Sequence, residues 1–108
     1  MIKTINVAGK PVVFKATAST LARYRDAFGS DLMDDYRKVT KEDEPDSSAL
    51  TIAFQIAYTM AKQGDPSIPD DMWDWLDDFE VFPVNEVLPE IIDLWSTSLG
   101  TKAEIKNA

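Results

Sequence analysis

The sequence contains no cysteine and no histidine among its 108 residues. Without cysteine there is no disulfide bridge, no thiolate zinc site and no redox switch. Without histidine as well, Ser-His and Cys-His nucleophile pairs and histidine-ligated haem are excluded. The composition alone therefore rules out much of enzyme chemistry.

Glycine and long apolar runs are also scarce. The four glycines are far apart in the chain, so none belongs to a Gly-rich phosphate-binding loop. Polar or charged residues interrupt every apolar stretch before it reaches the roughly twenty residues that a membrane-spanning helix needs. The segment 1–5 lacks the apolar region and the cleavage site of a secretory signal. We therefore expect a cytoplasmic protein that does not bind membranes.

Negative charge is abundant and unevenly distributed, with a formal net charge of -8. Residues 1–41 hold eight Lys/Arg and four Asp/Glu, residues 42–100 hold one and fourteen, and residues 101–108 hold two and one. An acidic main body repels phosphate backbones and anionic lipids, so neither nucleic acid nor a membrane is expected as a partner. This uneven charge has two possible roles. It either keeps the protein soluble, or it favours association with a neighbouring subunit or with a basic partner.

The pattern of apolar residues predicts an α+β fold that is mainly α, with an N-terminal β-hairpin followed by about five helices around one central buried helix. One domain is expected over residues 1–100, with a frayed tail at 101–108. Its parts are a hairpin (1–16), a helical corner (17–38), a flexible acidic loop (39–47) and a helical core (48–100).

The hairpin follows from two short runs rich in β-branched and apolar residues, Ile2–Val7 and Pro11–Lys15. Two strands alone are marginally stable in water. The hairpin must therefore lie against a helix or be paired along its edge by another chain.

Helical periodicity and capping residues predict five helices, at about 18–28, 31–38, 48–63, 70–79 and 85–99. The third is apolar over most of its circumference, which is typical of a helix buried on several sides, so we take it as the central helix. Its narrow polar stripe consists of Thr51, Gln55, Thr59 and Lys62.

The fourth helix is expected to face the core with Met72, Trp73, Leu76 and Phe79. On a helical wheel Trp75 lies about 60° from Met72 and about 160° from Trp73. Both indoles therefore cannot be central in one contact stripe, and we expect one of them on a rim.

Acidic pairs are the only feature that could imitate a catalytic or metal site, and none has the spacing of a calcium loop. Helix capping and solvation explain them equally well. We expect no catalytic residue, metal or cofactor, and hence no enzyme. The aromatic residues Trp73, Trp75 and Phe82, together with Ile5 and Val13 of the hairpin, are the candidate protein-binding residues.

Three segments carry a family resemblance: residues 56–69 (Ile-Ala-Tyr-Thr-Met-Ala-Lys-Gln-Gly-Asp-Pro-Ser-Ile-Pro), 73–77 (Trp-Asp-Trp-Leu-Asp) and 83–95 (Pro-Val-Asn-Glu-Val-Leu-Pro-Glu-Ile-Ile-Asp-Leu-Trp). With the strand pair and the Phe-Gly and Leu-Met pairs at 28–29 and 32–33, the chain resembles the tail assembly chaperones of long-tailed (siphovirus-type) phages and prophages of Gram-positive bacteria.

The resemblance implies a non-structural factor of virion morphogenesis in the host bacterial cytoplasm. Such a chaperone binds the tape measure protein, keeps it soluble, helps to recruit tail tube protein and is absent from the mature virion. Two alternatives stay open. One is a phage-encoded acidic DNA mimic that inhibits a host nucleic-acid-binding protein, and the other is a structural tail-completion subunit.

Overall fold

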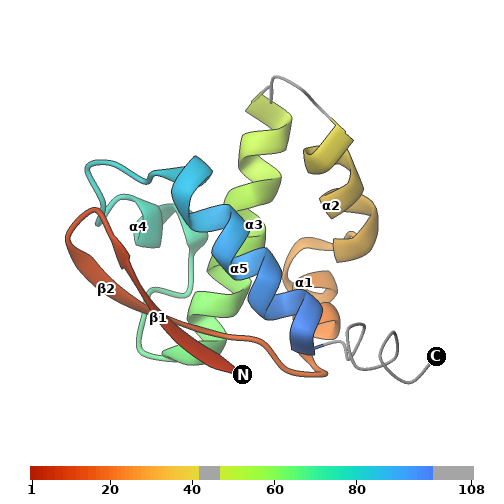
Figure 1. Cartoon of the computed structure of the whole chain (residues 1–108), viewed down its shortest axis with the longest axis horizontal. Helices are drawn as coiled ribbons and strands as arrows, with labels where there is room; N and C mark the ends of the chain where they lie inside the picture. Colours follow the sequence, from red (N-terminus) through yellow and green to blue (C-terminus); the bar gives the residue numbers. More distant parts are fainter. Residues whose placement is uncertain (42–46, 99–108) are drawn as a thin grey trace.

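The computed structural model describes residues 1–41 and 47–98. Its fold is α+β and mainly α, as predicted, with a two-stranded hairpin followed by five helices (Figure 1). The elements are β1 (Ile2–Val7), β2 (Lys10–Lys15), α1 (Thr20–Phe28), α2 (Leu32–Lys41), α3 (Ser47–Gly64), α4 (Met72–Leu76) and α5 (Val84–Ser98).

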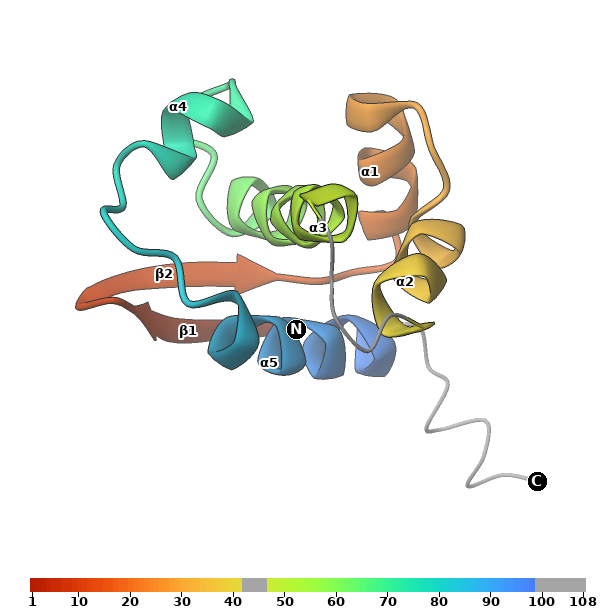
Figure 2. The ribbon, with the colours of Figure 1, turned by 90° about the horizontal axis from the view of Figure 1, so that it is seen from above.

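Helix α3 is the centre of the molecule, which confirms the prediction of one central buried helix. Strand β2 and helices α1, α2, α4 and α5 all pack against it. Figure 2 shows α3 in the middle, with the hairpin and α5 on one side of it and α1 and α4 on the other. Buried side chains from every element join in one apolar cluster, with Ile56 and Met60 of α3 fully enclosed.

The hairpin closes through a tight turn at Ala8 and Gly9. Both residues have positive φ angles, 51° and 91°, as in the two-residue turns whose twist matches that of antiparallel strands. The register pairs Val7 with Lys10 and Ile2 with Lys15. The inward face of the pair buries Ile5, Val7 and Phe14 against the helices.

The helical corner between α1 and α2 turns at Gly29. This residue has a φ of 73°, and its N–H donates to the Arg25 carbonyl at 2.7 Å, which ends α1. The loop predicted at 39–47 is wrong at both ends, because α2 continues to Lys41 and α3 begins at Ser47. Residues 42–46 lie outside the described part of the chain.

Helix α4 is shorter than predicted and faces the core differently. The Asp71 side chain accepts a hydrogen bond from the Asp74 N–H at 3.1 Å and caps its start. Only five residues follow, and their inward positions are Met72 and Trp75, so the prediction of Trp73 as an inward residue is wrong.

Helix α5 starts one residue before the predicted Asn85, and Pro89 stands inside it rather than in its first turn. The predicted end at Leu99, the stop at Gly100 and the frayed tail lie outside the described residues. Within residues 1–41 and 47–98, no helix combines the length and the apolar character that crossing a bilayer requires.

Candidate protein-binding surfaces

Trp75 belongs to the core. Its side chain is 3% exposed, and its ring lies 5.3–5.6 Å from the rings of Tyr58, Phe79 and Phe82. Tilted and edge-to-face contacts at these distances stabilise aromatic pairs beyond their buried area. Trp75 is therefore not available to a partner, and its assignment as a binding residue is corrected.

Trp73 occupies the opposite side of α4 and is 55% exposed. No described ring packs against it. Four exposed aspartates lie within four residues of it in the chain, and one of them, Asp71, caps α4. We call Trp73 and the other three, Asp70, Asp74 and Asp77, the Trp73 surface. It combines a large apolar group with negative charge, which suits a basic partner that also presents apolar contacts.

Lys62 fixes the connection that leads into the Trp73 surface. Its ammonium donates to the carbonyls of Pro66 and Ile68 at 2.9 and 2.7 Å and to the Asp70 carboxylate at 2.7 Å. The Lys62 hydrogen bond and charge lower the pKa of Asp70 below its usual value. Three points of the α3–α4 connection are thus bonded to the end of α3, and this connection leads directly into α4 and Trp73.

Phe82 lies half-buried between the core and the surface. Its ring packs edge-to-face on Phe54 at 5.6 Å and on Phe79 at 5.5 Å. Together with Leu50, Phe54, Pro83 and Val84 it lines an apolar groove of about 520 Å³ between the start of α3 and the start of α5. Phe82 is thus a groove residue, whose ring also contacts the buried Trp75 at 5.6 Å and not Trp73.

Ile5 and Val13, the two hairpin residues predicted as contacts, differ in their burial. The Ile5 side chain points toward the helices and is buried, so its assignment as an accessible contact is corrected. Val13 is half-buried and lines a recess of about 330 Å³ beside Ile68 and Phe79. A Cβ atom at Gly64 would collide with the Val13 carbonyl oxygen, so the C-terminal end of α3 lies directly against β2 there.

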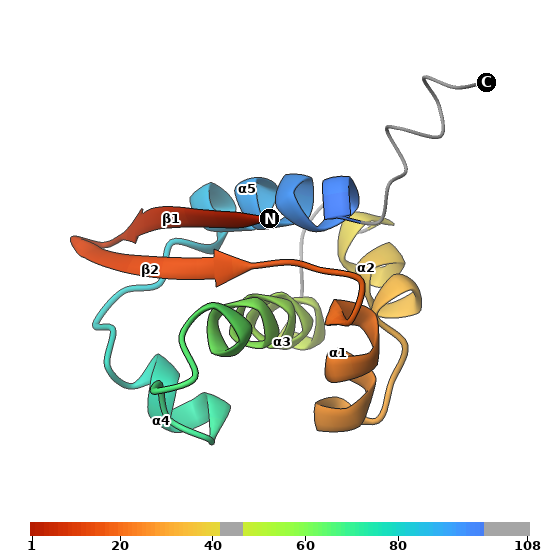
Figure 3. The ribbon, with the colours of Figure 1, turned by 90° about the horizontal axis from the view of Figure 1, so that it is seen from below.

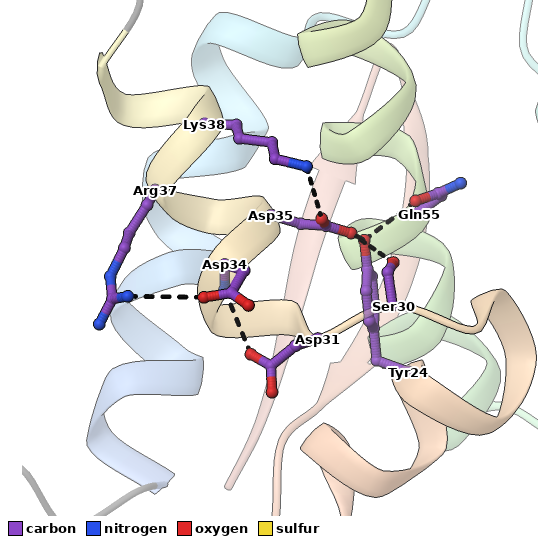
Figure 4. Close-up of polar contacts among 8 residues, drawn as sticks. All are labelled: Tyr24, Ser30, Asp31, Asp34, Asp35, Arg37, Lys38 and Gln55. Atoms are coloured by element: carbon purple, nitrogen blue, oxygen red, sulfur yellow. Dashed lines mark hydrogen bonds and ion pairs between the residues drawn. The ribbon is translucent and has the colours of Figure 1, made fainter.

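A polar cluster that the sequence did not predict holds α1 and α2 together (Figure 4). The buried Asp35 carboxylate accepts hydrogen bonds from the Tyr24 hydroxyl at 2.7 Å and the Ser30 hydroxyl at 2.6 Å, and Lys38 lies 3.8 Å from its other oxygen. The Tyr24 oxygen also lies 2.9 Å from the Gln55 side-chain amide of α3. One hydroxyl carries one proton, so a Gln55 amide turned to donate its N–H satisfies the second contact.

The cluster has the character of a structural clamp. Burial raises the pKa of the Tyr24 phenol, and the hydrogen bond and charge of Asp35 raise it further. At neutral pH the Tyr24 phenol therefore stays protonated, and its O–H donates a hydrogen bond to the Asp35 carboxylate. Each polar group is engaged by another within the cluster, so the buried charge is compensated inside the fold.

Part of this arrangement had a signal in the sequence. Asp35 stands on the inward stripe of α2 with Leu32, Tyr36 and Val39, at i, i+3, i+4 and i+7. An acidic residue at such a position indicates a buried carboxylate that needs a donor. The donor Tyr24 comes from another helix, and sequence spacing does not identify it.

No three carboxylates come together as a candidate metal site within residues 1–41 and 47–98. Comparisons with family models, with curated proteins and with solved structures yielded no match to this chain.

Proposed function

We propose that the protein is a phage tail assembly chaperone, which binds the tape measure protein and helps to recruit tail tube protein around it. The proposal starts from the sequence resemblance, which covers segments now located in α3, α4 and α5. A chaperone that coats a long helical client needs an exposed apolar contact, solubility and no chemistry of its own.

The observation that carries the proposal is the Trp73 surface. A tryptophan that stays 55% exposed on an ordered helix contributes little to its own core. Tryptophan is also the residue type most enriched among the side chains that dominate binding energy at protein interfaces. The neighbouring carboxylates keep the free protein soluble and favour a client with basic residues.

The test is co-expression with the tape measure protein encoded downstream, followed by co-purification at low and at high salt. We expect a soluble complex with the unchanged chain. Trp73→Ala should weaken it by about 1–4 kcal/mol, the range for an interface anchor. Val81→Ala is the matched control, since Val81 is similarly exposed at 63% but lies outside the Trp73 surface.

Circular dichroism of each variant shows whether the fold is kept. Client binding by folded Trp73→Ala that equals that of Val81→Ala would remove Trp73 from the binding site. Absence of any soluble complex, accompanied by inhibition of a host DNA-binding enzyme, would replace the chaperone by the DNA mimic. Stable incorporation of the protein into purified particles would indicate a tail-completion subunit instead.

A further inference from the structure

The outer edge of β1 is open. Met1 and Ala16 exchange hydrogen bonds at 2.8 and 2.9 Å, and bonded and non-bonded pairs alternate along an antiparallel ladder. In the observed register the backbone groups of Ile2, Thr4 and Asn6 therefore point away from β2. Within the described residues these outward N–H and C=O groups have no backbone partner.

The outer edge of β2 is protected, in contrast. Pro11 stands at one of its outward positions and has no N–H to offer. Val13 occupies another outward position of β2, and the end of α3 at Gly64 lies against its carbonyl. Proline, charge or a covering element are the usual means by which proteins protect such edges. Within residues 1–41 and 47–98, strand β1 has neither proline nor a covering element along its outward positions, and its one charged side chain, Lys3, pairs with Glu90 on the inward face.

Helix α5 lies over the inward face of the sheet on the side of β1, while α3 lies on the side of β2 (Figure 2, Figure 3). The flank of α5 toward β1 is identified by the ion pair between Lys3 and Glu90, at 3.0 Å. Glu86 is one helical turn before Glu90, is exposed and forms no ion pair within the described residues. It also borders the groove of Leu50 and Phe54, so it stands at the start of α5 between that groove and the flank marked by Glu90. Side chains of a strand added beside β1 would meet these carboxylates at every second position.

We infer that β1 accepts an extended segment of another protein as a third, antiparallel strand, and that this segment carries Lys or Arg at alternate positions. The inference rests on the proposed function, since the segment would belong to the client. Main-chain hydrogen bonds to Ile2, Thr4 and Asn6 would supply affinity. Cations that face Glu86, and that share Glu90 with Lys3 of β1, would supply specificity.

A second copy of this chain fits the same edge poorly. Two identical antiparallel edges are related by a two-fold axis perpendicular to the sheet, so the second α5 would arrive on the same face as the first. The acidic flanks of the two helices would then oppose each other. A basic segment of a different protein meets neither obstacle.

The probe is a dye-labelled peptide, acetyl-Thr-Lys-Val-Lys-Val-Lys-Thr-amide, with binding followed by fluorescence anisotropy. We expect it to bind the unchanged protein, to bind less well at high salt, and to slow hydrogen exchange of the Thr4 amide. The same peptide with Glu in place of Lys should not bind. Glu86→Lys should weaken binding of the Lys peptide.

Thr4→Pro removes an outward N–H without removing a bond to β2, whereas Thr4→Val keeps that N–H. We expect a loss of roughly tenfold or more for the proline variant and no loss for the valine variant. Methylating the peptide nitrogens tests the edge without altering the protein. N-methylation of the two valines, whose N–H groups would face β1, should reduce binding, while N-methylation of the lysines should not.

Equal binding of the Lys and Glu peptides, or of the two methylated peptides, would overturn the inference. So would a dimer of the free protein in which the β1 amides are already protected. Client capture that survives Thr4→Pro would leave the proposed function standing and remove the β1 site. Peptide binding without capture of the tape measure protein would do the reverse.

Discussion

Replacing Tyr24 by phenylalanine removes one hydroxyl from the buried cluster and leaves the ring in place. The lost group donates to the Asp35 carboxylate at 2.7 Å, and Asp35 is buried. A hydrogen bond to a charged group contributes about 1.5–3 kcal/mol to stability, because the carboxylate otherwise stays desolvated without its donor. We expect the free energy of unfolding to fall by that amount in Tyr24→Phe.

Tyr58→Phe is the matched control. Its hydroxyl donates at 2.6 Å to the carbonyl of Pro69, a neutral acceptor, so its loss should cost about 0.5–1.5 kcal/mol. Urea unfolding followed by circular dichroism measures both variants on one scale. A second arm combines Tyr24→Phe with Asp35→Ala, and the double variant should lose less stability than the sum of the two single variants.

A stability loss in Tyr24→Phe no larger than that in Tyr58→Phe would refute the contribution of the charged acceptor. Additive losses in the double variant would refute it equally, since they would mean that Tyr24 and Asp35 do not stabilise each other. In either case apolar contacts would hold α1 and α2 together, and the polar cluster would contribute little to stability.

Three further predictions concern the packing and the pH response. Gly64→Ala should destabilise the domain, because the added methyl group would collide with the Val13 carbonyl oxygen and displace α3 from β2. Thermal melting measures the loss of stability. An unchanged melting temperature would contradict the close approach of α3 to β2. Trp75→Ala should cost about 3–5 kcal/mol, as for a large aromatic removed from a core, so a variant with near-normal urea stability would contradict its burial. The pKa values of Tyr24 and Tyr58 are both raised by burial, so the folded state holds these protons more tightly than the unfolded state. Stability should therefore be complete below about pH 10 and decrease as the pH rises above it, less steeply in Tyr24→Phe; an equal slope in both proteins would show that Tyr24 is not involved.

Much of the fold follows from local patterns in the sequence. The β-branched runs around Ala8 and Gly9 predict the hairpin, and a helix apolar on most sides predicts α3 as the centre. Gly29 and Gly64 end α1 and α3 where the pattern places them. These features depend on periodicity and chain breakers, which a single segment contains in full.

Features that depend on which side of a short element faces inward were harder to predict. A helix of five residues presents Met72 with either Trp73 or Trp75, and the choice follows from Tyr58 and Phe82, which are remote in the sequence. The sequence predicted that one indole lies on a rim, and the structure identifies it as Trp73. The burial of Asp35 likewise depends on a donor from another helix.

Two of the three indoles are buried and one is exposed, so the intrinsic fluorescence of the protein can report on a single site. Trp75 and Trp95 are 3% and 2% exposed, while Trp73 is open to solvent among carboxylates. Trp73 should therefore dominate the red side of the emission spectrum and be the indole most open to collisional quenchers. Its anionic neighbours should make caesium a better quencher than iodide, and added salt should reduce that difference. A partner that covers α4 would shield this one fluorophore, so its occupancy could be followed in the unlabelled protein.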